Sequence, residues 1–288
     1  GFTYKCPACD IALTYHKTSN NLRCHYCGYT IFKSDTCPNC HEKALTDYGL
    51  GTEKLELELN KLFPAAKVIR MDADTTTHKG AHQDIIERFK KHEYDILLGT
   101  QMIAKGLDFP LVTLVGVINA DATLNIPDFR SGERTYALLS QVAGRAGRHN
   151  LLGEVILQTF NPTNFTLKCV QENNYEKFYN YEMNNRHKLD YPPYYFLTSL
   201  KIASKDYDLA RQEITKVRTF LDKNLSKQTI ILGPTTSAVF KMNNIYRFQI
   251  LLKYKRDAYL TKCLKELDEM YSLNNKVNLE IDNDPLQV

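Results

Sequence analysis

The 288-residue sequence lacks several features that would place it in familiar classes. It contains no glycine-rich Walker loop, so if the chain acts on a nucleotide, we expect half of the nucleotide site to lie elsewhere. It has no apolar run near the roughly 18 residues that a membrane helix needs, and its start does not resemble a signal peptide. These absences favour a cytoplasmic protein over a membrane-embedded one. The net charge of +4 permits a nucleic-acid partner without requiring one.

Cysteine is the most informative residue that is present. Six of the eight cysteines form three Cys-x-x-Cys pairs in the first forty residues: Cys6/Cys9, Cys24/Cys27 and Cys37/Cys40. A two-residue spacer lets one tight turn direct two thiolates at the same metal ion. Without a secretory signal, this spacing favours zinc over disulfides, and repeated pairs argue against an iron–sulfur cluster. Residues 1–44 show little hydrophobic periodicity, so we expect metal to hold them together.

Six thiolates do not divide into closed zinc sites of four ligands, which indicates that the chain is incomplete. Four cysteines close in sequence could form one site: Cys6, Cys9, Cys24 and Cys27. Cys37 and Cys40 are then half a site. His25 and His41 could complete it, but each directly adjoins a pair and we interpret both as solvated neighbours. Four thiolates leave no open coordination position, so we expect a structural role.

Strand and helix patterns alternate from residue 45 to residue 163. The predicted elements are a helix capped by Thr52 and stopped by Pro64, strands at 67–71, 95–98, 111–118 and 154–159, and helices at 80–91 and 134–146. This alternation predicts an α/β domain with a doubly wound parallel sheet. A helical connector is expected over residues 164–190, ending before Tyr191-Pro192-Pro193.

The remaining residues, 191–288, predict a small α+β domain with the order β-α-β-β-α-β. The expected strands are 196–203, 230–232, 246–253 and 277–281, and the expected helices are 207–225 and 258–271. Asn243 and Asn244 are predicted to form the turn before the third strand. In that strand Tyr246, Phe248, Ile250 and Leu252 alternate with polar residues.

The segment QVAGRAGR, residues 141–148, has the pattern of a catalytic helix. Gln141, Gly144, Arg145 and Arg148 share one helical face. Each glycine costs a helix roughly 1 kcal/mol relative to alanine, so close approach of a polyphosphate explains them better than structure alone. We interpret Arg145 and Arg148 as arginine fingers for a γ-phosphate; a solvated basic helix end is the alternative.

Two further segments indicate phosphate or nucleic-acid contacts. GTQMIAKGLDFP, residues 99–110, leaves a buried strand at its carboxyl end, where ligands bind in open α/β sheets. Thr100, Gln101 and Lys105 are candidate DNA contacts, and Gly106 and Asp108 candidate nucleotide contacts. GLGTE, residues 49–53, places a threonine at a helix N-terminus, where Thr52 could bind a DNA phosphate. Each of these residues taken singly could also be a solvated loop residue.

These segments together resemble one known family. GTQMIAKGLDFP and QVAGRAGR look like motifs V and VI of superfamily 2 helicases. Combined with the cysteine pairs, GLGTE, DADTT at residues 72–76 and DFRSGER at residues 128–134, they resemble the PriA family of bacterial replication-restart helicases. The similarity runs along essentially the whole chain, including DNDP at residues 282–285.

The resemblance implies an ATP-dependent motor that moves 3′ to 5′ on DNA and acts at stalled forks in primosome assembly. It implies a RecA-like second helicase lobe with a cysteine-rich insertion, which in the full-length family binds two zinc ions. One zinc site would be complete here, and Cys37/Cys40 would be half of the second. The first lobe, with the Walker lysine and the acidic box for ATP and Mg²⁺, and the first strand of the second lobe would precede Gly1. We therefore expect the fragment alone not to hydrolyse ATP.

The resemblance also implies partners for the C-terminal domain. These are DNA, as forks or single strands, the acidic tail of single-stranded DNA-binding protein and other primosome proteins, but no membrane. Candidates for the basic surface are Lys241, Arg247, Lys253 and Arg256. A solvated strand face is the alternative for each. For the whole chain, the alternatives are another superfamily 2 translocase or a non-catalytic, zinc-bearing DNA- or partner-binding module.

Overall fold

The computed structural model describes residues 2–16, 20–43, 51–104, 109–144 and 153–286. The chain divides into two compact units, one made of residues 1–47 and 183–288 and the other of residues 48–182. Among the described residues no helix is both long enough and apolar enough to cross a membrane.

A three-stranded antiparallel sheet forms the cysteine-rich region of the first unit. Its strands are β1 (Thr14–His16), β2 (Asn21–Arg23) and β3 (Thr30–Phe32), in that order. Leu13 and Leu22 are the buried aliphatic residues of this region and lie beside the cysteines. Two leucines bury too little apolar surface to stabilise a fold of this size, which agrees with the expected need for metal.

The second unit alternates strands and helices, as predicted. Its elements are α1 (Thr52–Leu62), β4 (Val68–Met71), α2 (Ala81–Lys90), β5 (Ile96–Gly99), a 3₁₀ helix η1 (Gln101–Ala104), β6 (Leu114–Val117), α3 (Asp121–Leu124), α4 (Ser131–Ala143), β7 (Glu154–Leu157) and α5 (Phe165–Gln171). β4 pairs in parallel with β5, and β6 pairs in parallel with β7. The parallel pairing is confirmed, but among the described residues the strands form two separate pairs and not one sheet.

Two helix ends differ from the prediction. α1 has Gly51 as its N-cap, in an extended conformation, so the prediction that Thr52 caps this helix is wrong. The Thr52 hydroxyl instead donates to Asp72. α4 ends at Ala143, before the predicted end at Ala146, and Gly144 is its C-cap. Glycine is a poor helix former and is common just past helix ends, which explains the earlier stop.

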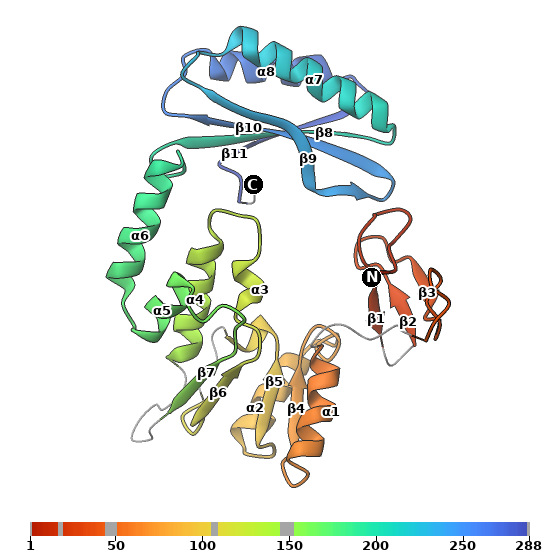
Figure 1. Cartoon of the computed structure of the whole chain (residues 1–288), viewed down its shortest axis with the longest axis vertical. Helices are drawn as coiled ribbons and strands as arrows, with labels where there is room; N and C mark the ends of the chain where they lie inside the picture. Colours follow the sequence, from red (N-terminus) through yellow and green to blue (C-terminus); the bar gives the residue numbers. More distant parts are fainter. Residues whose placement is uncertain (1, 17–19, 44–50, 105–108, 145–152, 287–288) are drawn as a thin grey trace. The chain divides into compact units, whose positions relative to one another are not determined.

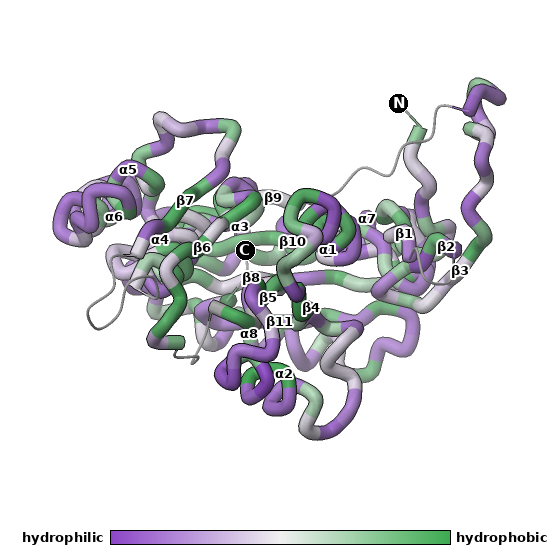
Figure 2. Tube along the Cα trace, turned by 90° about the horizontal axis from the view of Figure 1, so that it is seen from below, coloured by the Kyte–Doolittle hydropathy of each residue, from purple (hydrophilic) through white to green (hydrophobic). Residues whose placement is uncertain are grey.

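The predicted helical connector consists of two helices, α5 and α6 (Tyr175–Lys188), with Asn173 in the left-handed conformation between them. α6 is largely hydrophilic, as its purple tube in Figure 2 shows. Phe178 is its buried residue, and its ring stacks on Tyr136 of α4 with centroids 4.4 Å apart. α5 adds its buried residues Leu167, Cys169 and Val170 to the same cluster, so both helices of the connector pack against the second unit.

The C-terminal part of the first unit has the predicted β-α-β-β-α-β order. Its elements are β8 (Phe196–Ser204), α7 (Tyr207–Asn224), β9 (Ile230–Met242), β10 (Ile245–Tyr254), α8 (Leu260–Tyr271) and β11 (Asn278–Asn283). The strands form an antiparallel sheet in the order β11-β8-β10-β9. Both helices cover one face of this sheet (Figure 1).

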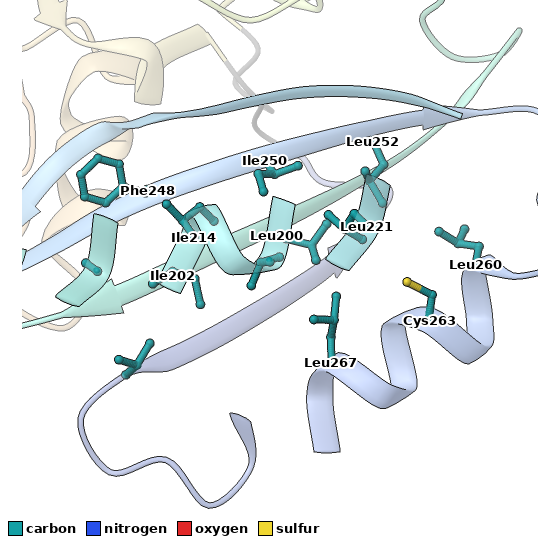
Figure 3. Close-up of a cluster of buried hydrophobic side chains, with 13 residues drawn as sticks. Leu200, Ile202, Ile214, Leu221, Phe248, Ile250, Leu252, Leu260, Cys263 and Leu267 are labelled. Carbon is teal, nitrogen blue, oxygen red and sulfur yellow. The ribbon is translucent and has the colours of Figure 1, made fainter. Parts of the chain in front are cut away.

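The core of this C-terminal part lies between the sheet and the two helices. Figure 3 shows Ile250 and Leu252 of β10 directed at Leu221 of α7, with Leu260 and Leu267 of α8 closing the cluster. Each of these side chains is at most 8% exposed, and full burial of such a side chain stabilises the fold by about 1.5–3 kcal/mol. This is the largest buried cluster among the described residues.

Candidate metal centre and helicase motifs

The three Cys-x-x-Cys turns have the same backbone conformation. In each turn the N–H of the first cysteine donates to the carbonyl five residues later, and the residue after the second cysteine donates to the carbonyl of the first. That donating residue is left-handed in all three turns: Asp10 (φ 53°), Gly28 (φ 76°) and His41 (φ 59°). Glycine adopts this conformation without strain, and aspartate and histidine adopt it more often than most other residues.

Four of the six thiols converge. The sulfur atoms of Cys6, Cys9, Cys24 and Cys27 all lie within 4.8 Å of one another. Cys6 Sγ and Cys27 Sγ are 3.4 Å apart, too far for a disulfide of about 2.05 Å. A tetrahedron with Zn–S bonds of ~2.3 Å has sulfur atoms about 3.8 Å apart, so the cluster has the dimensions of a zinc site. His25 and His41 are exposed and do not belong to this cluster.

The electrostatics of the cluster also fit a cation. Burial raises the pKa of the Cys6 thiol to about 12 and raises the pKa of Cys9 as well. At Cys24 burial acts in the same direction, but backbone N–H groups of Cys27 and Tyr26 outweigh it and lower the pKa to about 7. A buried thiol with a raised pKa keeps its proton at neutral pH, whereas a bound divalent cation stabilises the thiolate form. Zinc therefore fits this donor set, and the four cysteines would hold it.

The third pair shares the turn but has no partner thiols among the described residues. Cys37 is buried and Cys40 is exposed. N–H groups of Cys40 and Asn39 lower the pKa of Cys37, so its turn already favours a thiolate. The remaining two cysteines, Cys169 and Cys263, are buried residues of α5 and α8, where burial raises the pKa of each thiol.

The GLGTE and DADTT segments meet at the carboxyl end of β4. Asp72 is 5% exposed, and it accepts the Thr52 hydroxyl at 2.6 Å and the N–H of Thr75 at 3.0 Å. Arg70 Nε lies 2.9 Å from the same carboxylate. Burial would raise the pKa of Asp72, but these three partners outweigh it and hold the pKa below its ordinary value. Asp72 is a structural carboxylate that the sequence did not single out as one.

This network bears on the predicted DNA role of Thr52. Because its hydroxyl proton is donated to Asp72, that proton is not directed at solvent. A phosphate at this helix end would meet the first backbone N–H groups of α1, and Thr52 would offer it only a hydroxyl oxygen. The DNA contact of Thr52 stays a prediction.

The two predicted motor segments are adjacent in the second unit. β5 ends at Gly99, where a Cβ would lie 2.5 Å from the Met71 carbonyl oxygen of β4, so the strand pair requires glycine there. Thr100 and Gln101 follow and are exposed. The helix η1 that begins at Gln101 contacts α4, which carries Gln141. The elements of both segments are thus side by side, at the strand end where binding was expected.

The structure describes only some of the residues of these two segments. Gln141 is exposed near the end of α4, with Leu139 buried on the opposite side. Gly144 is exposed as the C-cap. The predicted residues Lys105, Gly106, Asp108, Arg145 and Arg148 lie outside the described residues.

The predicted basic surface of the C-terminal part is smaller than expected. Lys253 is 6% exposed, its Nζ donates to the Leu189 carbonyl at 2.8 Å, and it lies 3.5 Å from the centre of the Tyr191 ring. Placing Lys253 on a solvated basic face was therefore wrong, because the connector covers it. Arg247 is partly buried and Arg256 is exposed. Lys241 donates to the Pro7 carbonyl of the cysteine-rich region at 2.8 Å.

Comparison with known proteins gives three family matches in order along the chain. Residues 6–31 match the PriA DNA helicase Cys-rich region (CRR) domain, residues 41–150 the helicase conserved C-terminal domain, and residues 187–286 the primosomal protein N C-terminal domain. With the four-thiol cluster and the parallel strand pairs, these matches define the class of the chain. It carries a PriA-type cysteine-rich region, a helicase conserved C-terminal domain and a primosomal protein N C-terminal domain.

Whole-chain relatives narrow the class to one family. The replication restart protein PriA of Bacillus subtilis (strain 168) is 45% identical over 288 residues, which cover 99% of this chain and 36% of that protein. Its counterparts in Synechocystis sp. and Haemophilus influenzae are each 38% identical, over 100% and 99% of this chain and 35% and 39% of their own lengths. The chain belongs to the PriA family, and it spans little more than a third of these curated relatives.

Proposed function

We propose that this chain is the C-terminal part of an ATP-dependent DNA helicase that moves 3′ to 5′ and acts at stalled replication forks in primosome assembly. The observation that carries the proposal is the order of the cysteine-rich, helicase and C-terminal family segments within one chain. Each relative named above bears the name replication restart protein. A cytoplasmic location is part of the same proposal.

In this proposal the α4 end serves ATP hydrolysis. Arg145 and Arg148 would reach the γ-phosphate, and Gln141 and Gly144 would line its approach. ATP and Mg²⁺ would be held by a separate Walker-bearing lobe, because the 288 residues contain no Walker sequence. The contact between η1 and α4 supports this arrangement, since it brings the two motor segments to one edge of the unit.

Further proposed nucleotide contacts are Gly106 and Asp108. DNA would be contacted by Thr100, Gln101 and Lys105 beside β5, by Thr52 at α1, and by Arg247 on the C-terminal sheet. Single-stranded DNA-binding protein and other primosome proteins are the proposed protein partners. The exposed Arg256 and the partly buried Arg247 are the described candidates that remain for an acidic tail.

The cysteine-rich region would carry one complete zinc site and half of another. The shared turn conformation of Cys37 and Cys40 supports the half site, because the pair is already folded as a ligand turn. Two further thiolates from outside the 288 residues would complete it.

A chimaera tests the proposal. The 288 residues replace the corresponding segment of the Bacillus subtilis relative, to which they are 45% identical. The chimaera is expected to hydrolyse ATP in response to forked DNA and to unwind the fork. Replacing Arg145 and Arg148 together by alanine should lower the hydrolysis rate by ~10³-fold or more while DNA affinity is kept, because an arginine finger acts on the transition state.

The isolated 288-residue chain is the control and is expected to bind DNA without hydrolysing ATP. Robust DNA-stimulated hydrolysis by the isolated chain would contradict the division of the nucleotide site. A folded chimaera that binds forks but never turns over ATP would favour a non-catalytic binding module instead.

A further inference from the structure

The turn between β9 and β10 carries two consecutive left-handed residues. Asn243 has φ 53° and Asn244 has φ 59°, and the flanking Met242 and Ile245 pair across the hairpin. Two left-handed residues make a tight two-residue turn that continues the twist of the strands, and asparagine is the side chain that best tolerates this conformation after glycine. The turn leaves the N–H groups of both asparagines free of the ladder.

These two N–H groups donate to the first cysteine turn. Asn243 N–H donates to Cys9 Sγ at 3.3 Å, and Asn244 N–H donates to the Ala8 carbonyl at 2.8 Å. Lys241 Nζ donates to the Pro7 carbonyl at 2.8 Å. Three successive residues of the Cys6–Cys9 turn are thus each bonded by the hairpin. Met242 adds an apolar contact, because it packs against the core of the cysteine-rich region.

The bond to Cys9 differs in origin from those at Cys6 and Cys24. Cys6 receives N–H groups from Ala8 and Cys9 of its own turn, and Cys24 receives them from Tyr26 and Cys27 of its own turn. Cys9 receives its backbone N–H from Asn243, which lies 234 residues away in the sequence. One of the four thiols is therefore satisfied by the C-terminal part of the chain.

We propose that the β9–β10 turn is an outer shell of the zinc site, so that zinc binding and seating of this hairpin on the cysteine-rich region stabilise each other. An N–H group donates more strongly to a metal-bound thiolate than to a neutral thiol, because the acceptor is charged. The Asn243 N–H already lies 3.3 Å from Cys9 Sγ, so it holds this ligand atom in position for the metal. By linkage, seating of the hairpin raises zinc affinity by the same factor. The proposal rests on zinc in the four-thiol site and not on helicase activity.

Two double variants at the same positions separate backbone from side-chain effects. Asn243→Gly with Asn244→Gly removes both amide side chains but keeps both N–H groups and the left-handed turn. Asn243→Val with Asn244→Val removes the same amides and disfavours the left-handed turn, because branched side chains clash there. Zinc affinity of the 288-residue chain is measured by competition with a chromophoric chelator. We expect the Gly pair to bind Zn²⁺ like the native chain and the Val pair to bind about 10-fold or more weakly, the usual loss for an outer-shell change.

Hydrogen exchange on the native chain tests the same coupling without any substitution. The amides of Asn243 and Asn244 should exchange slowly in the zinc-loaded chain and at least about 10-fold faster after chelation, since their acceptors belong to the metal turn. The amides of Ile250 and Leu252, within the C-terminal sheet, should not change.

Equal zinc affinity of a folded Val pair and the native chain would overturn the proposal. So would an equal loss in the Gly pair, because the backbone geometry would then be irrelevant. If the Val pair does not fold, the exchange experiment on the native chain is sufficient by itself: equal exchange rates of the Asn243 and Asn244 amides with and without zinc would overturn the proposal. Failure of the native chain to bind Zn²⁺ would remove the metal site itself.

Discussion

At the scale of single residues, the bond from Thr52 to Asp72 yields a direct prediction. Thr52→Val removes the hydroxyl that donates to a carboxylate 5% exposed. We expect the unit of residues 48–182 to lose about 1–3 kcal/mol of unfolding free energy, because a buried charged acceptor loses a donor. Thr52→Ser keeps the hydroxyl and should stay near the native value. Denaturant unfolding at pH 7 measures both; a Val variant as stable as the Ser variant would show that this bond contributes nothing.

The same bond fixes the direction of the pH dependence. The pKa of Asp72 is lowered in the folded chain by its partners, against the opposing effect of burial. A carboxylate whose pKa is lower in the folded than in the unfolded chain stabilises the fold above the unfolded pKa, which is about 3.9. This stabilisation is lost as the pH falls through the folded pKa. The difference between Thr52→Val and the native chain should therefore be constant at neutral pH and shrink below about pH 4.

Lys253 illustrates where reading single residues from the sequence fails. Alternation in β10 places Ile250 and Leu252 against the helices, and the structure confirms both. The same alternation predicts Lys253 on a solvated face. That face is covered at Lys253 by Leu189 and Tyr191, which lie in the segment between α6 and β8. Strand periodicity says which face a residue occupies but not what else covers that face.

At the scale of elements, most of the fold was predictable because periodic segments bury one face. The helices and strands of the second unit and the C-terminal order were predicted with shifts at their ends. β9 is the exception: it was expected at 230–232 and runs from Ile230 to Met242. Gly233 and Pro234 follow the predicted segment and lie within the strand, where a Cβ on Gly233 would meet the Gln249 carbonyl oxygen at 2.8 Å. β1, β2 and β3 have three residues each and give no periodic signal.

The candidate metal centre was predictable for a different reason. Cysteine spacing indicates ligand turns locally but leaves their partners open; the four-thiol site that the family resemblance implied is the set whose sulfur atoms converge. The donor from Asn243 could not be predicted, because nothing in the sequence indicates which distant backbone N–H meets Cys9. The Asn-Asn turn was itself recognisable and is the one signal that the sequence offered.

The cysteine-rich region as an element makes a prediction about zinc content. Cys37→Ser with Cys40→Ser should leave about one zinc per chain, because the closed site uses the other four thiols. Cys24→Ser should lose that zinc, because three thiolates remain around a buried position. Atomic emission on purified chains gives the zinc content. If the Cys37/Cys40 variant lost zinc as completely as the Cys24 variant, the four-thiol assignment would fail.

At the scale of the whole molecule, the division into two units has a measurable consequence. Residues 1–47 and 183–288 form one unit and residues 48–182 the other. Each unit has a buried core of its own. In the first unit this core is the cluster between the C-terminal sheet and helices α7 and α8, and in the second unit it is the cluster of α4, α5 and α6. The two units are therefore expected to unfold in separate transitions.

A matched pair of leucines tests this. Leu267 of α8 is 1% exposed and Leu139 of α4 is 2% exposed, so the same substitution, leucine to alanine, is made in a helix core of each unit. Each substitution should lower the unfolding free energy of its own unit by about 2–5 kcal/mol, because it deletes buried methyl groups and leaves a cavity. Calorimetry of the 288-residue chain should show Leu267→Ala shifting one transition and Leu139→Ala shifting the other. A single transition that both variants lower equally would mean that the chain unfolds as one cooperative body, and the two-unit description would have to be abandoned.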